Sequence, residues 1–505
     1  MLTTRITLRR FSGGEIKGPF NFIAGSPCFP RDPVGFNGVT EPSTGELLAE
    51  VASSGPETVN WAVESAVKGF EDWRTREPRE RAKVLLGVSR LLERDLEKLA
   101  RLEVRDSGKP IWEARVDVKS CADAFEYFGC VAAALRGGHV QLLGGNFGLV
   151  KREPFGVVGG IGAWNFPIQN CSSKVAPALA AGNSMVFKPS EFTPMTAMSL
   201  GELLKEAGLP DGVYNVVQGG AETGKQIVEH PQVSKVSFTG SVPTGSWIMS
   251  SAAKKIIPVT LELGGKSPVI IFEDAEMNNA VKAALLANFL SQGAVCSNGT
   301  RVYVHKNVYE EFVERVVDAT KAMKIGDPMN EDTVVGATIS KQQAEKVLGY
   351  VARAKESGAV VLCGGDRVIL PHPLDQGFYL SPCVLTNVKD DSEIVKHEVF
   401  GAVMCVMSFE SEDEVVNRAN DSDLGLAGAV FTKDLARGHR IADKLEVGSV
   451  WINNYNLFLS ELPFGGFKKS GFGRENGVEG LECYTQTKSV YVETGDVDCG
   501  PLMTS

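Results

Sequence analysis

Short apolar stretches alternate with longer amphipathic ones between residues 155 and 272. The apolar stretches predict buried strands at 156–163, 184–188, 213–217, 235–238, 259–262 and 268–272. The intervening stretches carry apolar residues at helical spacing and predict helices at 168–181, 194–207, 223–230 and 243–255. Strands that alternate with helices are typical of a doubly wound, mostly parallel sheet, which binds ligands beyond the carboxyl ends of its strands.

Three helices are predicted ahead of this region. One begins near Pro56, a residue suited to a first helical turn, and the others cover 78–105 and 111–135. Residues 15–55, which precede them, read as irregular and rich in strands, with turn signals between the strands. We expect the three helices to pack on the sheet that the later residues supply.

A second alternating set follows residue 300. The pattern predicts strands at 301–305, 359–362 and 402–409, and helices at 309–323, 341–357, 412–419 and 436–445. This set is long enough to form a second α/β domain with its own core.

Two segments stand outside both predicted cores. Residues 137–152 read as a hairpin whose turn lies near Gly144-Gly145-Asn146, and 484–493 alternate like a strand. Neither segment has a core of its own, so we expect a small β arm that serves assembly of subunits.

Composition excludes several classes of protein. The 505 residues are 43% hydrophobic and 23% charged, which is ordinary for a globular protein, and the net charge of −10 argues against nucleic-acid binding. No apolar run reaches the length of a membrane span. Ten cysteines without Cys-x-x-Cys spacing and six scattered histidines favour a reducing compartment and give no metal site.

The first fourteen residues carry Arg5, Arg9 and Arg10 and no acidic residue. This composition weakly resembles a mitochondrial import signal, and a plain basic arm is the alternative. We expect a cytoplasmic protein.

Cys296 lies in a loop between a helix-like run at 280–289 and the strand at 301–305. A thiol that a loop presents at its surface can serve as a nucleophile. The alternative is a small buried apolar residue, as most free cysteines are.

Two strand ends carry residues suited to a nucleotide. At 238–245 a strand ends in Gly240 and Ser241 and a helix opens with Pro243, and backbone amides at a helix N-terminus bind phosphate. At 188–191, Lys188 and Glu191 could hold ribose hydroxyls, and an acid there favours NAD over NADP. The alternatives are an ordinary glycine turn and a solvated ion pair.

Two further strand ends carry residues suited to acyl chemistry. Asn165, in 161–167, offers a neutral amide donor for an oxyanion, with helix capping as the alternative. Glu262 stands between Leu261 and Leu263, where desolvation would raise its pKa and suit it to general-base work. A glutamate on an edge strand facing water is the alternative.

Taken together, these stretches resemble the NAD(P)-dependent aldehyde dehydrogenase superfamily along nearly the whole chain. The motifs that carry the resemblance, in the family's order and spacing, are 161–167, 188–191, 238–241, 261–265, Cys296, 398–401 and 463–466. Stretches 217–224, 235–245 and 470–477 are most similar to the branch that acts on 4-trimethylaminobutyraldehyde and betaine aldehyde.

The resemblance implies a mechanism and a set of site residues. Cys296 attacks the aldehyde carbon, Asn165 and the Cys296 N–H hold the oxyanion, and Glu262 activates the water that hydrolyses the thioester. NAD is the implied cofactor, and the residues implied to bind it are Trp164, Lys188, Glu191, Gly240, Ser241, Glu398 and Phe400. Lys174 aligns with a lysine that the family often has near the active site, and its role is open.

The resemblance also implies the domain organisation. A Rossmann-like cofactor-binding domain would comprise 15–135 and 154–264, interrupted by an oligomerisation hairpin at 136–153. The catalytic domain would comprise 265–468, and an oligomerisation strand would follow at 482–497. The implied assembly is a homotetramer, a dimer of dimers, acting on a small-molecule aldehyde without a nucleic-acid or membrane partner.

Three residues depart from the family pattern. Ala294 stands where glutamine or glutamate is usual, Ala402 where proline is usual, and Ser173 where the trimethylamino-aldehyde branch has tryptophan. The last could remove one wall of an aromatic site for a quaternary ammonium group. The candidate substrate-contacting residues are Phe166, Trp451, Tyr455 and Phe458, and packing in the core is the alternative for Trp451 and Tyr455.

Two other functions stay open. Ser173 leaves room for a broad-specificity aliphatic aldehyde dehydrogenase, and the three departures leave room for a structural, crystallin-like protein with weak or no catalysis on the same scaffold. The complete set of Cys296, Asn165 and Glu262 favours an enzyme that oxidises aminoaldehydes.

Overall fold

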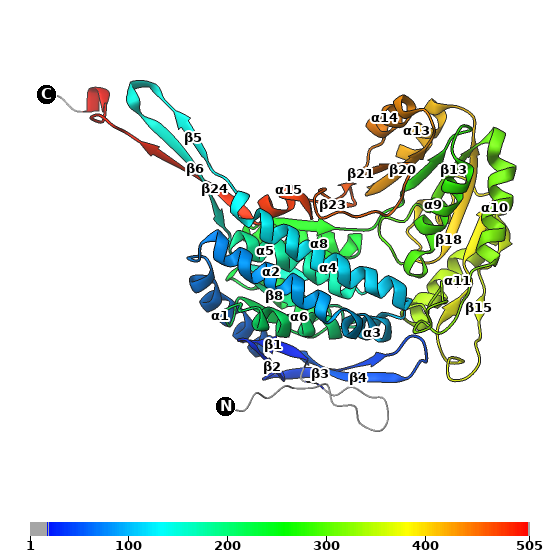
Figure 1. Cartoon of the computed structure of the whole chain (residues 1–505), viewed down its shortest axis with the longest axis horizontal. Coiled ribbons are helices and arrows are strands. Elements are labelled where there is room, and N and C mark those ends of the chain that lie inside the picture. Colours follow the sequence, from blue (N-terminus) through cyan, green and yellow to red (C-terminus); the bar gives the residue numbers. More distant parts are fainter. Residues whose placement is uncertain (1–17, 19, 503–505) are drawn as a thin grey trace.

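The computed structural model describes residue 18 and residues 20–502 (Figure 1). The chain forms two lobes, and a narrow arm projects from one of them (Figure 1). The basic segment with Arg5, Arg9 and Arg10, on which the prediction about mitochondrial import rests, lies outside the described residues. Among the residues described, no helix combines the length and the apolar character that a membrane span requires.

An eight-stranded sheet forms the centre of the first lobe, in the order β2-β1-β9-β8-β7-β10-β11-β23. The strands from β9 to β11 run parallel, and β1, β2 and β23 extend the edges antiparallel. This arrangement confirms the predicted doubly wound sheet. The bounds are β1 Asn21–Ile23, β2 Ser26–Cys28, β7 Val157–Ile161, β8 Ser184–Lys188, β9 Tyr214–Val216, β10 Val233–Thr239, β11 Val259–Glu262 and β23 Gly471–Phe472.

Helices cover both faces of this sheet and bury two separate apolar clusters. One face packs against α5 (Pro167–Ala181) and α6 (Met195–Glu206). The other face packs against α1 (Pro56–Trp73), α7 (Ala221–Glu229) and α8 (Val242–Lys255). Burial on both faces explains why the parallel strands read as continuous apolar stretches rather than as alternating ones.

The prediction of one helix over 78–105 is wrong. The chain forms α2 (Pro78–Arg94) and α3 (Leu96–Ser107), because Asp95 leaves helical geometry at φ −98° and ψ 12°. The Asp95 carboxylate accepts hydrogen bonds from Arg94, its neighbour. The bend keeps the apolar face of α3, including Leu99 and Val104, in the core.

The expected packing of three helices on the sheet holds for α1 alone. α1 contacts β7, β8 and β9, whereas α2, α3 and α4 (Ile111–Val131) pack mainly on one another and on α5 and α6. They form an additional layer, because α5 and α6 already cover that face of the sheet.

The second lobe has its own sheet, in the order β14-β17-β18-β13-β12-β20-β21. All neighbours run parallel except β14, which pairs antiparallel with β17. The strands are β12 Pro268–Ile271, β13 Arg301–His305, β14 Val360–Cys363, β17 Cys383–Thr386, β18 Val403–Phe409, β20 Ala427–Phe431 and β21 Ser449–Ile452. The helices are α9 Met277–Phe289, α10 Tyr309–Lys321, α11 Lys341–Glu356, α12 Glu393–Lys396, α13 Glu412–Asn420 and α14 Leu435–Lys444.

The predicted hairpin and tail strand form one antiparallel sheet. β5 (Gly138–Gln141) and β6 (Phe147–Pro154) make the hairpin, and β24 (Thr485–Val492) pairs with β6 along its whole length. This sheet is the arm that projects from the first lobe (Figure 1). A short helix, α15 (Gly477–Glu482), leads into β24.

The remaining strands pair locally. β3 (Pro33–Thr40) and β4 (Leu47–Ser54) form an antiparallel hairpin within the predicted strand-rich region. The short pairs are β15 Arg367–Val368 with β16 Tyr379–Leu380, and β19 Leu424–Gly425 with β22 Phe467–Lys468.

Candidate active site

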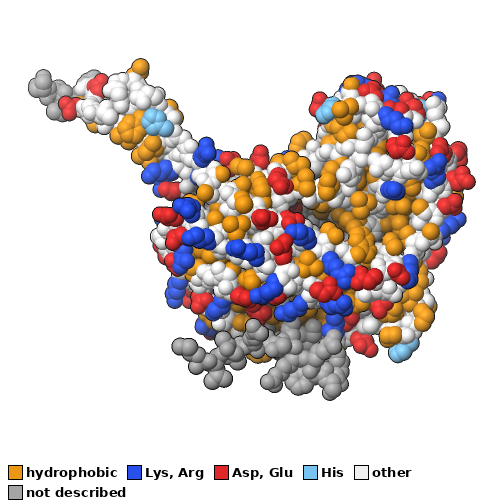
Figure 2. All heavy atoms as spheres, in the orientation of Figure 1, with side chains coloured by type: hydrophobic (Ala, Val, Ile, Leu, Met, Phe, Trp, Pro, Cys, Tyr) orange, Lys and Arg blue, Asp and Glu red, His pale blue; other side chains and the backbone are white. Residues whose placement is uncertain are grey.

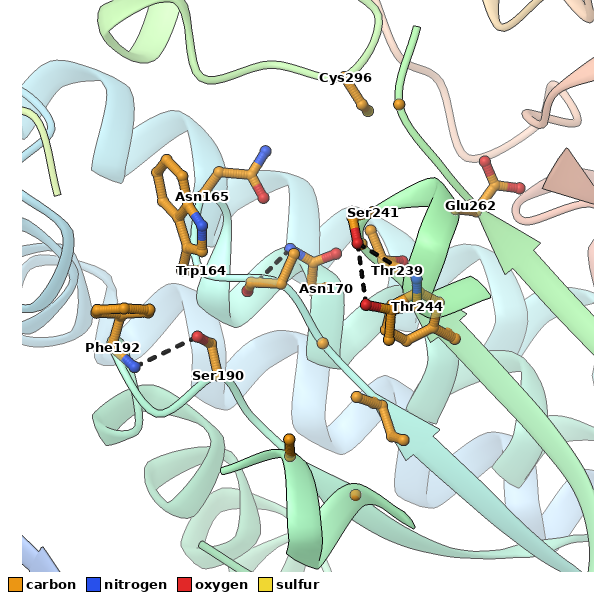
Figure 3. A pocket seen from close by; sticks show the side chains of 18 of the residues that line it. Trp164, Asn165, Asn170, Ser190, Phe192, Thr239, Ser241, Thr244, Glu262 and Cys296 are labelled. Atoms are coloured by element: carbon orange, nitrogen blue, oxygen red, sulfur yellow. Dashed lines mark hydrogen bonds between the residues drawn. The ribbon is translucent and has the colours of Figure 1, made fainter. Parts of the chain in front are cut away.

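A cleft of about 700 Å³ opens at the carboxyl ends of β7, β8, β10 and β11, where the fold class predicts a ligand site. Hydrophobic side chains gather in the hollow between the two lobes (Figure 2). Eleven of the residues that the sequence selected line this one cleft: Trp164, Asn165, Phe166, Lys188, Glu191, Gly240, Ser241, Glu262, Cys296, Glu398 and Phe400. Figure 3 shows Trp164, Asn165, Ser241, Glu262 and Cys296 among them.

Cys296 lies on a loop between α9 and β13, half-buried at the cleft wall. The loop leaves α9 through a tight turn in which Ser291 (φ 49°), Gln292 (φ 53°) and Gly293 (φ 76°) are all left-handed. Gly293 is required here, because a Cβ at this position would lie 2.1 Å from the carbonyl carbon of Gly401. The turn therefore directs the thiol into the cleft rather than into the core.

The Asn165 side chain points from the end of β7 toward Cys296 (Figure 3). It is 5% exposed, and its Nδ2 donates to the Ala294 carbonyl at 2.8 Å. A side-chain amide carries two N–H groups, so this bond leaves the second for a ligand. The helix-capping alternative is not seen, because Phe166 is the N-cap of α5 and no side chain caps it.

Glu262 is the last residue of β11, and its side chain lies across the cleft from Asn165 (Figure 3). Its side chain is 4% exposed, and neither carboxylate oxygen has a hydrogen-bond partner. Burial, with the charge of Glu475, raises the pKa of Glu262 well above its usual range. This bears out the desolvation inferred from the flanking leucines, and the alternative of a water-facing edge position is wrong.

Burial also raises the pKa of the Cys296 thiol to about 12, and the negative charges of Glu398 and Glu262 add to the shift. The sulfur and the carboxyl group of Glu262 therefore both favour their neutral forms in the free protein. The thiol must therefore lose its proton before it can act as a nucleophile, and Glu262 must lose its proton before it can act as a base.

We expect the alkylation of Cys296 by iodoacetamide in the free protein to depend steeply on pH. Only the thiolate reacts, and below a pKa of about 12 its fraction rises about tenfold with each unit of pH. Peptide mass spectrometry of the alkylated protein between pH 7 and 9 measures the rate at this one cysteine. A rate that levels off below pH 8 would contradict the burial and charge effects.

Lys188 and Glu191 line the cleft on either side of Ser190 in the sequence, and Ser190 lies away from Cys296 in Figure 3. Lys188 is buried, and its Nζ donates to the carbonyls of Pro189 at 2.8 Å and Gly219 at 2.7 Å. Burial lowers its pKa. Its Nζ lies 3.8 Å from a carboxylate oxygen of Glu191, which is partly exposed to the cleft. The alternative of a solvated pair therefore fails for the lysine.

The N-terminus of α8 (Val242–Lys255) also lines the cleft, through Ser241, Pro243 and Thr244. Ser241 is the N-cap, and its Oγ lies 3.5 Å from the Thr244 N–H and 2.9 Å from the Thr244 hydroxyl. The amides of the first helical turn and the positive end of the helix dipole favour an anion at this place.

Residues from both lobes close the cleft beside Cys296. The ring of Phe400 meets Trp164 edge-on, with centroids 5.1 Å apart. Phe400 is left-handed at φ 58°, and its carbonyl accepts a hydrogen bond from Gln343 at 2.8 Å. Glu398 accepts from the Gly265 N–H at 3.3 Å, and burial raises its pKa to about 7.

Lys174 lies behind Glu262, fully buried in α5. Its Nζ donates to the Thr239 hydroxyl at 2.6 Å and to Glu475 at 2.7 Å. Lys174 is not among the residues that line the cleft, so it acts on Glu262 through charge rather than on a ligand.

The predicted substrate residues separate into two groups. Phe166 lines the cleft, whereas Trp451, Tyr455 and Phe458 form an aromatic cluster with Phe464 outside the cleft-lining set of the described chain. Tyr455 is fully buried and donates to the Ser297 carbonyl at 2.7 Å, which favours core packing. Phe458 is exposed.

The three departures from the family pattern fit the local structure. Ala294 contributes its backbone carbonyl to Asn165, which any residue could supply. Ala402 lies with its backbone against Gly293, and its carbonyl accepts from Cys383 at 2.8 Å. Ser173 supplies no aromatic ring in place of the tryptophan, and its hydroxyl lies 3.5 Å from the Asn170 carbonyl.

Several cleft residues were not predicted from the sequence. They are Asn170, Ser190, Phe192, Lys225, Thr244, Trp247, Gln343 and Lys346. Gln343 and Lys346 come from α11 in the second lobe, and only the approach of the two lobes brings them to the cleft. Thr244 and Ser190 lie within motifs that the sequence did select, so closer attention to side chains there would have found them.

No group of three or more His, Cys, Asp or Glu side chains is placed to hold a metal ion in the described part of the chain. The polar groups along the cleft are amides, hydroxyls, lysines and single carboxylates. This set suits an organic ligand with phosphate and ribose groups.

Comparisons with known proteins agree with this geometry. The model of a family described as the aldehyde dehydrogenase family matches residues 35–490. The chain is 52% identical over 484 residues to 4-trimethylaminobutyraldehyde dehydrogenase from Homo sapiens, covering 96% of this chain and 98% of that protein. It is 53% identical over 486 residues to 4-trimethylaminobutyraldehyde dehydrogenase B from Danio rerio, covering 96% and 94%.

Two solved structures are similar over nearly their whole length. An NAD+ complex of an aldehyde dehydrogenase from Bacillus cereus aligns with a TM-score of 0.91 and 40% identity, covering 94% of this chain and 96% of that one. A betaine aldehyde dehydrogenase from Staphylococcus aureus in complex with NAD+ aligns with a TM-score of 0.91 and 37% identity, covering 95% of each chain.

Proposed function

This chain belongs to the aldehyde dehydrogenase family, and we propose that it oxidises aminoaldehydes such as 4-trimethylaminobutyraldehyde or betaine aldehyde to carboxylic acids with NAD. The single observation that carries the substrate class is 52% identity over nearly the full length to a 4-trimethylaminobutyraldehyde dehydrogenase. The cleft supports the reaction, because a thiol, an amide and a buried carboxyl group converge on one space.

In the first half of the proposed reaction, the Cys296 thiol gives its proton to water in the cleft, and the sulfur attacks the aldehyde carbon. The aldehyde oxygen becomes an oxyanion. It accepts hydrogen bonds from the free side-chain N–H of Asn165 and from the backbone N–H of Cys296. Bound NAD supplies the acceptor for the hydride that leaves this carbon. A thioester on Cys296 remains.

Glu262 acts as the general base in the second half of the proposed reaction, the hydrolysis of the thioester. Its buried carboxylate takes a proton from water, and the hydroxide attacks the thioester carbonyl, which releases the acid and the thiol. A raised pKa makes this carboxylate a stronger base than an exposed glutamate. Lys174 and Glu475 lie behind it and set the local charge.

The residues present fit NAD. We propose that Lys188 and Glu191 hold the adenosine ribose, that Gly240 and Ser241 at the N-terminus of α8 hold the pyrophosphate, and that Glu398, Phe400 and Trp164 hold the nicotinamide half. The support is that all of these residues line one cleft together with the thiol of Cys296. Phe166 contacts the substrate in this proposal, whereas Phe458 is an exposed member of the aromatic cluster.

Purified protein incubated with NAD and 4-trimethylaminobutyraldehyde should form NADH, followed by absorbance. Betaine aldehyde and hexanal in the same assay separate an aminoaldehyde dehydrogenase from a broad aliphatic one. Equal or higher kcat/KM with hexanal would favour the aliphatic alternative, for which Ser173 is the specific observation. NAD binding without turnover of any short aldehyde would favour the structural, crystallin-like alternative.

Replacing Glu191 should weaken the preference for NAD over NADP. The Glu191 carboxylate would repel the additional 2′-phosphate of NADP, and its loss leaves Lys188 to attract that phosphate. We expect E191S to raise the ratio of kcat/KM for NADP to that for NAD by about tenfold or more, since one charge contact is worth about 1.4 kcal/mol or more in a cleft.

Glu222 offers a matched control for this experiment. It lies on α7, outside the residues that line the cleft, and pairs with Lys225 at 2.6 Å. E222S changes the net charge equally and should leave the cofactor ratio unchanged. An equal shift in both variants would show a general charge effect instead.

We propose that the arm joins subunits into a homotetramer. The support is a three-stranded sheet with exposed apolar side chains, including Val140, Leu143 and Tyr491, and little core of its own. Analytical ultracentrifugation of the full chain tests this, and a monomer would contradict it. We also propose a cytoplasmic location, supported by ten free cysteines, which subcellular fractionation tests.

A further inference from the structure

The turn that precedes Cys296 is held by a side chain from the other lobe. Glu113 lies in the first turn of α4 and is 2% exposed. Its Oε1 accepts a hydrogen bond from the Ser291 N–H at 3.1 Å. Ser291 is the first of the three left-handed residues in this turn.

The backbone of this turn is strained and depends on contacts with its surroundings. Left-handed geometry is costly for Ser291 and Gln292, which are not glycines, and persists only where the surroundings enforce it. The turn also orients the Ala294 carbonyl, to which Asn165 donates. Two hydrogen bonds from the first lobe, from Glu113 and from Asn165, therefore fix one turn of the second lobe.

A buried charged cluster around Lys109 lies near Glu113, and the Lys109 ammonium group acts on the Glu113 carboxyl group through its charge. Lys109 pairs with Asp117, lies 4.0 Å from Glu103, and stands 4.1 Å above the ring of Phe166. The first turn of α4 is tied to the second lobe, because the Ile111 N–H donates to the Pro328 carbonyl at 2.8 Å. Phe166 lines the cleft, so Lys109 of this cluster reaches the cleft wall through the Phe166 ring.

We propose that Glu113 is a positioning residue for the reaction proposed above: by accepting the Ser291 N–H it fixes the turn that presents Cys296 and the Ala294 carbonyl. It touches neither substrate nor cofactor and acts through the loop. This inference rests on the proposed function, because the reaction that it supports is the one assigned to Cys296 and Asn165.

The state of the Glu113 side chain determines the choice of variants. Burial raises its pKa to about 8, while Lys109 and the Ser291 bond oppose that shift. The carboxyl group is therefore mostly protonated at pH 7, and its second oxygen has no hydrogen-bond partner. Glutamine has the same shape, no charge and one carbonyl acceptor, so E113Q retains the bond to Ser291, whereas E113A removes it.

The experiment compares E113A, E113Q and wild type at pH 7 in two reactions. One is oxidation of the aldehyde with saturating NAD, and the other is hydrolysis of 4-nitrophenyl acetate, which needs the thiol and the oxyanion donors but no cofactor. We expect E113A to lower kcat about tenfold to a hundredfold in both reactions, with KM for NAD within twofold of wild type. E113Q should stay within threefold of wild type in both.

Asp106 supplies the matched control. It is equally buried, and its Oδ2 accepts one backbone N–H, that of Met195 at 3.0 Å, far along the chain from the Cys296 loop. D106A also removes a buried carboxyl group that accepts a backbone N–H. It should lower Tm by about as much as E113A does, while kcat stays within threefold of wild type. If E113A cannot be purified, E113D withdraws the acceptor by one methylene and should lower kcat in the same way.

Three results would overturn the proposal: kcat of E113A within twofold of wild type, E113Q as slow as E113A, or D106A as slow as E113A. Failure of the proposed function would look different, because wild type itself would not oxidise any aldehyde. The ester assay would still report on the position of the thiol in that case.

Discussion

Replacing Cys296 with serine should abolish aldehyde oxidation while leaving the fold intact. A hydroxyl is far less acidic than a thiol and a weaker nucleophile, and no strong base in the cleft could ionise it. We expect kcat/KM to fall by about 10⁴-fold or more, the scale seen when a nucleophile is removed. NADH formation at saturating NAD measures the loss.

The variant C130S is the control for this experiment. Cys130 is exposed on α4, far from the cleft-lining set, and should behave as wild type. Tm and NAD binding should be unchanged in C296S, because the sulfur is half-buried and has no packing role that oxygen could not fill. Residual oxidation within tenfold of wild type would remove Cys296 from the mechanism.

Glu262→Gln should separate the two halves of the reaction. The amide keeps the shape of a buried side chain that has no hydrogen-bond partner, but it cannot take a proton from water. We expect steady-state kcat to fall about 10²-fold to 10³-fold, the usual contribution of a general base. Stopped-flow absorbance should still show a first turnover, with about one NADH formed per active site.

Glu202 gives a control of similar chemistry in the same lobe. It lies on α6, burial raises its pKa, and it does not line the cleft. E202Q should leave kcat unchanged. A slow E262Q enzyme without a rapid first turnover would assign Glu262 to the first half of the reaction rather than to hydrolysis.

The family and the fold class were predicted correctly from the sequence, because both depend on local patterns. Parallel strands buried on both faces read as short apolar stretches, and the ends of these strands carry the cleft residues within a few positions of each stretch. Lys188, Gly240 and Glu262 were found in this way. The raised pKa of Glu262 followed from its two leucine neighbours.

What the sequence did not predict depends on contacts between distant segments. Glu113 reaches Ser291 across 178 positions, and Lys346 enters the cleft only through the approach of α11. The break at Asp95 was missed because the apolar spacing continues across it. The sequence suggested that Tyr455 could contact the substrate, yet Tyr455 is fully buried and donates its hydroxyl to the Ser297 carbonyl of the Cys296 loop.

The central claim is that the thiol of Cys296, the amide of Asn165 and the carboxyl group of Glu262 act on one carbonyl carbon. The most direct test mixes E262Q with NAD and aldehyde, quenches the mixture in acid, and maps acyl adducts by peptide mass spectrometry. The account predicts about one acyl group per chain, attached to Cys296 and released by hydroxylamine. NADH formation with no acyl group on Cys296, or with the group on another residue, would contradict it.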